Sequence, residues 1–85
     1  MKVKVEMTLL DHPTAEHQQE MRSAAAGLTS EKKSIVVCEH TSQPQTLVAQ
    51  FTMKTAAQYK VVDEIARQFK NKVRDYADIT IGFAK

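Results

Sequence analysis

Residues 34–53, SIVVCEHTSQPQTLVAQFTM, lie near the middle of the chain and decide its fold. The β-branched run Ile35, Val36 and Val37 favours a strand over 34–40. The polar residues 41–45 form a turn, and residues 46–53 then alternate between apolar and polar side chains. Two strands joined by a short polar turn predict an antiparallel hairpin.

A helix is predicted immediately after this hairpin. Thr55 and Gln58 fit a capping box, in which each side chain satisfies a free backbone amide at a helix start. Apolar residues then recur at spacings of three and four, as on one face of a helix that ends near Arg74. These residues are Val62, Ile65, Ala66, Phe69 and Val73.

A second helix is predicted before the hairpin. Asp11 and Pro13 indicate its start, because a carboxylate caps free amides and proline is tolerated in the first turn. The helix should run to about Ala26 and stop at Gly27. Its core-facing side chains are expected to be His17, Met21, Ala24 and Leu28.

The two ends of the chain complete the pattern with alternating segments, 2–9 and 78–83, which each predict a strand with one buried face. The element order strand, helix, strand, strand, helix, strand predicts an α+β, two-layer ferredoxin-like sandwich (βαββαβ). Right-handed crossovers place the antiparallel strands in the order 4-1-3-2, with both helices on one face. The other face of the sheet is left open.

Composition indicates one globular domain over residues 1–85. The chain has a formal net charge of +2, too small to require nucleic acid or an anionic membrane as partner. A single cysteine, Cys38, excludes an internal disulfide and favours a cytoplasmic location. We expect no signal peptide and no membrane span, because no apolar stretch is long enough for either.

The residues expected on the open face suggest contact with another chain. Val36, Cys38, Val48 and Gln50 form the interface candidates, because the two valines and the cysteine make a small apolar patch beside the edge strand 34–40. We therefore expect a homo-oligomer through the open face or this edge. The other outward residues are Lys2, Lys4, Glu6, Thr8, Thr52, Thr80 and Gly82, with His40 at the end of its strand.

RNA binding is the obvious alternative use of an open four-stranded sheet. RNA-recognition sheets stack bases on aromatic side chains of the two central strands. The corresponding outward positions here hold no aromatic residue, and Phe51 falls on the inward side. Sequence-specific RNA binding of this type is not expected.

Metal binding and catalysis have only weak candidates. Cys38 and His40 are two residues apart on a strand and point the same way, but a metal site needs three or four ligands. Asp11, His12 and His17 cluster where a general base could lie, although Asp11 is explained more simply as a helix cap. We assign no catalytic residue, no metal and no cofactor.

A basic stripe follows the second helix. Lys60, Arg67, Lys70 and Arg74 recur at helical spacing and are candidates for binding an anion or nucleic acid. A solvated helix face opposite an apolar one explains the same pattern, and Asp63 and Glu64 dilute its charge.

Three interpretations of function stay open, because proteins of this fold have many different activities. The first interpretation is a non-enzymatic, self-associating interaction or regulatory module. The alternative is a small enzyme or ligand-binding protein, with a pocket between subunits or beside the first helix that uses His12, His17, Cys38 or His40. The third is nonspecific nucleic-acid or anion binding by the basic stripe.

Overall fold

The computed structural model describes residues 2–54 and 58–84, without the side chains of residues 58–60 and 84. Within these residues the strands form one antiparallel sheet in the order β2-β3-β1-β4. This confirms the predicted ferredoxin-like sandwich and its strand order. The elements are β1 (Lys2–Leu9), α1 (Ala15–Ala26), the 3-10 helix η1 (Lys32–Ser34), β2 (Val36–Glu39), β3 (Thr46–Thr52), α2 (Gln58–Lys72) and β4 (Tyr76–Ala84).

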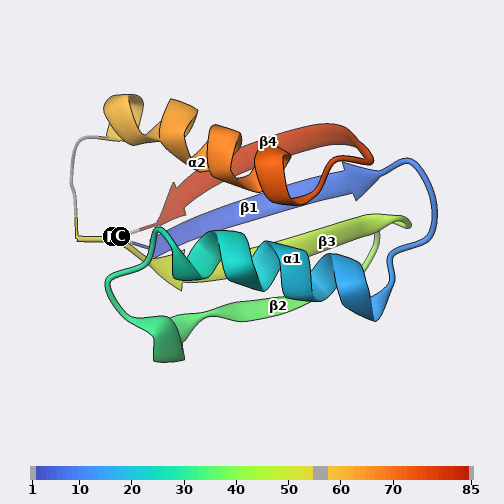
Figure 1. The fold of residues 1–85 in the computed structure, drawn as a ribbon, viewed down its shortest axis with the longest axis horizontal. Coiled ribbons are helices and arrows are strands. Elements are labelled where there is room, and N and C mark those ends of the chain that lie inside the picture. The colour runs from blue at the N-terminus through green and yellow to red at the C-terminus, as the bar shows by residue number, and fades with distance from the viewer. Residues whose placement is uncertain (1, 55–57, 85) are drawn as a thin grey trace.

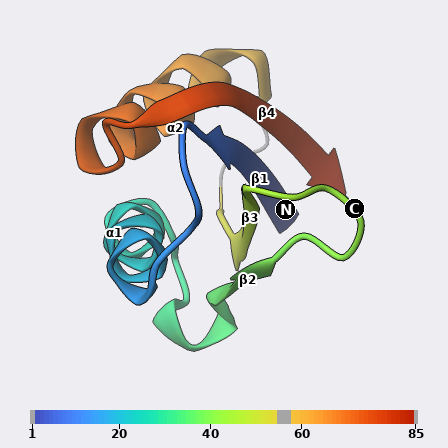
Figure 2. The same cartoon turned by 90° about the vertical axis from the view of Figure 1, so that its right-hand side faces the viewer.

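The helices and the sheet form two layers. Figure 1 shows α1 and α2 side by side in front of the strands, and Figure 2 shows both helices on the same face of the sheet. No helix among the described residues is long and apolar enough to cross a membrane. Among the described residues, no helix covers the opposite face of the sheet.

The core lies between the two layers, where the alternation of the strands meets the apolar faces of the helices. In β1 the inward side chains are at most 2% exposed. Ile65 and Phe69 of α2 are fully buried, as is Val73 directly after the helix. The rings of Phe51 and Phe69 stack with their centroids 6.0 Å apart, which joins β3 to α2. The inward residues of β1 are Val3, Val5, Met7 and Leu9.

Helix α1 begins differently from the prediction. Its N-cap is Thr14, whose Oγ1 accepts a hydrogen bond from the His17 backbone N–H at 3.3 Å. The His17 Nδ1 in turn accepts from the Thr14 N–H at 3.0 Å, which completes a capping box. The prediction of Asp11 as the cap was wrong, because this carboxylate accepts instead from the backbone N–H of His12.

Other element ends differ by a few residues. Strand β2 is shorter than predicted, since Ser34 belongs to η1 and His40 turns into the hairpin loop. Helix α2 ends at Lys72, and β4 begins at Tyr76 rather than at 78. The predicted capping box of Thr55 and Gln58 lies outside the residues and side chains that the structure describes.

Candidate binding site on the open sheet face

The open face is organised in rows that cross the sheet. Val36 pairs with Gln50, Gln50 with Lys4, and Lys4 with Gly82, so these four residues form one row over all four strands. We call this row the Gly82 row. The neighbouring row holds Cys38, Val48, Glu6 and Thr80 in the same strand order.

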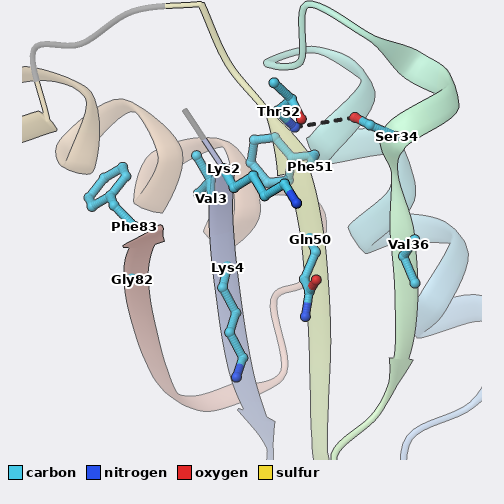
Figure 3. A pocket seen from close by; sticks show the side chains of 10 residues that line it. All are labelled: Lys2, Val3, Lys4, Ser34, Val36, Gln50, Phe51, Thr52, Gly82 and Phe83. Carbon is cyan, nitrogen blue, oxygen red and sulfur yellow. Dashed lines mark hydrogen bonds between the residues drawn. The ribbon is translucent and has the colours of Figure 1, made fainter. Parts of the chain in front are cut away.

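A hollow of about 470 Å³ lies over the Gly82 row, at the end of the sheet where β1 begins. Figure 3 shows Lys4 and Gln50 on neighbouring strands, with Val36 beyond them on β2 and Gly82 on β4. Its volume is within the range of roughly 300–1,000 Å³ that small-molecule sites occupy. The lining residues are Lys2, Val3, Lys4, Ser34, Val36, Gln50, Phe51, Thr52, Gly82 and Phe83.

Gly82 leaves space at one end of the row. A Cβ built on Gly82 would meet no atom within 4 Å. The backbone does not require glycine here, since neither glycine of the described chain has a positive φ. Glycine weakens a strand interior, and in sheets it often marks a place where a ligand or another backbone approaches closely.

The rim of the hollow beside η1 is held by hydrogen bonds to Thr52. Its N–H donates to the Ser34 Oγ at 3.2 Å, and its carbonyl oxygen accepts from the Thr29 Oγ1 at 2.6 Å. The Ser34 hydroxyl also donates to the carbonyl of Glu31 at 2.7 Å. Hydrogen bonds within the protein therefore hold this rim in place without a ligand.

The charge of the hollow is positive. Among the residues that the structure describes, its lining contains Lys2 and Lys4 and no residue with a carboxylate. The Lys4 Nζ lies 3.8 Å from the Glu6 Oε1, while the Lys4 side chain stays 49% exposed. Lys2 has no ion-pair partner among the described residues.

In the other half of the open face, a contact between His40 and Glu6 crosses the middle of the sheet. The His40 Nε2 lies 3.4 Å from the Glu6 Oε2, although β3 separates their strands. This contact crosses above β3, where Val48 is only 5% and Thr46 only 2% exposed. The prediction that Val48 is exposed was therefore wrong, whereas Val36 is 53% exposed.

His40 has both ring nitrogens engaged. Its Nδ1 accepts hydrogen bonds from the backbone N–H groups of Ser42 and Gln43, at 3.1 and 3.0 Å. The proton must then lie on Nε2, which faces Glu6. Cys38 is exposed, and the described residues contain no cluster of three metal-ligating side chains that would join it to His40.

The histidines near α1 are placed away from the hollow. The Nε2 of His17 lies 2.7 Å from the Asp75 Oδ2, while its Nδ1 serves the capping box, so this ring links α1 to the start of β4. None of the four residues expected to form a pocket lines the open-face hollow. Those residues were His12, His17, Cys38 and His40.

Two of the four residues in the predicted basic stripe contact neighbouring side chains. Arg67 pairs with Glu64, and the Lys70 Nζ lies 5.8 Å from the centre of the Tyr76 ring. A hydrogen bond from the Gln68 amide, together with Arg67, lowers the pKa of the Glu64 carboxyl. Arg74 lines a polar groove between α1 and α2, and the side chain of Lys60 is not described.

Sequence reasoning placed most of these residues on the open face but missed the hollow. It found neither the row that brings Lys4 opposite Gly82 nor the contribution of Phe83. The available signal was Gly82 itself, a glycine inside the otherwise strand-forming segment 76–84.

Comparisons with known proteins give a likeness of fold. No protein-family model and no curated protein matches the chain. One similar solved structure is described as a "putative antibiotic biosynthesis monooxygenase" from Deinococcus radiodurans. It is 14% identical, with a TM-score of 0.44, and the match covers 100% of this chain and 93% of that one.

This comparison corrects the first functional interpretation. A non-enzymatic self-associating module was expected, whereas the similar protein is described as an enzyme. We do not carry that interpretation further. The description belongs to the other protein, so a function for this chain has to rest on its own residues.

Proposed function

We propose that this protein binds a small molecule in the open-face hollow. The observation that carries the proposal is the free space above Gly82, in the same row as Lys4, Gln50 and Val36. A side chain at this position would be sterically acceptable and would favour the strand, yet the position is left bare. The ligand takes the space that a side chain would fill.

The lining supports this use. Val36 offers a half-exposed apolar surface, and its burial under a ligand is favourable at roughly 25 cal/mol per Å². Gln50 supplies an amide that both donates and accepts hydrogen bonds. The rim fixed by Thr52 and Ser34 lowers the entropic cost of binding.

Filling the hollow tests the proposal. The probe is 8-anilinonaphthalene-1-sulfonate (ANS), a fluorescent dye with an apolar body and an anionic group. We expect Gly82→Val to weaken ANS binding at least tenfold in a fluorescence titration, because the valine occupies the free space. Circular dichroism and thermal unfolding check that the variant keeps its fold.

Thr80→Val is the matched control, since Thr80 lies on the same strand and face outside the hollow lining. It should bind ANS as the unmodified protein does. Equal affinity of both variants and the unmodified protein would refute the proposal, and so would equal loss in both variants.

We also propose that copies of the chain assemble through the open face or the β2 edge, so that the hollow lies at a subunit interface. The exposed Val36 and the four-residue edge strand β2 support this assembly. Sedimentation equilibrium with and without ANS tests it, and a monomer at every concentration under both conditions would contradict it.

We propose further that the protein works in the cytoplasm. The free, exposed thiol of Cys38 supports a reducing compartment. Fractionation of cells that express the untagged chain tests this location, and recovery outside the cytoplasmic fraction would count against it.

A further inference from the structure

We infer that the ligand of the hollow is an organic anion, with its acidic group at Lys2 and Lys4 and an apolar body lying toward Val36. This inference rests on the proposed function and names the ligand's chemical class. It is carried by the distribution of charge and apolar surface along the Gly82 row.

The lysines supply the attraction for an anion. Both project from the same face of β1, two residues apart, which places their Cα atoms about 7 Å from each other. Figure 3 shows the Lys2 side chain extending toward β3, while the Lys4 side chain runs along β1. An anion between them would gain two ammonium partners, in a lining whose described residues include no carboxylate.

Glu6 does not cancel this charge. One of its oxygens lies 3.8 Å from the Lys4 Nζ, and the other lies 3.4 Å from the His40 Nε2. Glu6 also lies outside the lining of the hollow. Lys4 can therefore turn toward a ligand while Glu6 keeps its contact with His40.

The spacing of the strands sets the size of the apolar body. Val36 lies two strands away from Lys4, a distance of about 10 Å at the usual strand separation. Gln50 occupies the strand between them and can hydrogen-bond to a polar group in the middle of the ligand. A body of two linked or fused rings spans this distance.

A matched pair of dyes tests the inference. ANS carries a sulfonate, and N-phenyl-1-naphthylamine has the same aromatic body without it. We expect ANS to bind at least tenfold more tightly than the neutral dye. Added salt should weaken ANS binding and leave the neutral dye unaffected, because it screens exposed charges.

Lysine variants locate the charge. Lys4→Met and Lys2→Met keep an unbranched side chain that is one atom shorter and remove its charge. Each should weaken ANS binding about three- to fivefold, as expected for an exposed ion pair. Neither should change binding of the neutral dye. Lys70→Met on α2 makes the same change in net charge away from the hollow, and it should leave both dyes unaffected.

The outcomes separate this inference from the proposed function. If both dyes bind equally well and both are displaced by Gly82→Val, the hollow is a binding site but its ligand is not an anion. If neither dye responds to Gly82→Val, the proposed function itself fails. If Lys70→Met weakens ANS binding as much as Lys4→Met does, the attraction comes from net charge and the inference is wrong.

Discussion

His17 and His40 make the same two kinds of contact in different parts of the chain. The Nδ1 of His17 accepts from one backbone N–H and that of His40 from two, and each ring directs Nε2 to a carboxylate, that of Asp75 or that of Glu6. In this arrangement Nδ1 cannot also accept a proton from a substrate. Both rings therefore hold chain segments together, and the sequence alone does not reveal this because the carboxylates are distant in the chain.

Val36 and Val48 face the same side of the sheet but differ in burial. Val48→Ala should lower the free energy of unfolding by about 1.5 kcal/mol, because it removes two buried methyl groups. Val36→Ala should change it by less than about 0.5 kcal/mol, as surface substitutions usually do. Urea unfolding of the two variants measures the difference, and equal losses would show that the Glu6–His40 contact does not cover Val48 in solution.

Among the elements, α1 shows most clearly where sequence patterns fall short. The sequence contains a cap-forming residue at both Asp11 and Thr14, and the simple rules for helix starts accept either. The structure selects Thr14, because Asp75, just before β4, holds the His17 ring where its Nδ1 can accept from the Thr14 amide. That choice depends on a tertiary contact.

The cap of α1 can be tested directly. Thr14→Ala should lower the free energy of unfolding by about 1 kcal/mol, because the His17 N–H loses its acceptor. Ser23→Ala, a substitution inside the same helix, is the control and should not destabilise the protein, since alanine favours helices. Chemical denaturation compares the two, and a Thr14→Ala variant as stable as the unmodified chain would contradict the assigned cap.

The strands were predictable because apolar and polar residues alternate along each of them in the sequence. Alternation placed Val3 and Val5 of β1 inward and Lys2 and Lys4 outward, as the structure shows. The hollow was not predictable in the same way. It depends on the lateral register, which sets Gly82 opposite Lys4, and no pattern within a single strand encodes that pairing.

At the scale of the whole molecule, the two faces of the sheet differ, since one packs against the helices and the other is open. The helix-covered face contains the buried core, including the stacked rings of Phe51 and Phe69. On the open face, the Glu6–His40 contact crosses β3 in one half, and a hollow lies along the Gly82 row in the other. The net charge of +2 does not indicate what kind of ligand binds. The two positive charges of Lys2 and Lys4 at the hollow favour an anionic one.

The chain's two glycines allow the central claim to be tested with one spectrum. Gly82 lies in the hollow, and Gly27 lies at the C-cap of α1 in the helix layer. In protein labelled with ¹⁵N-glycine and titrated with ANS, the Gly82 amide signal should shift in step with the dye's fluorescence, while the Gly27 signal stays in place. A rise in fluorescence without any movement of the Gly82 signal would contradict binding in the open-face hollow.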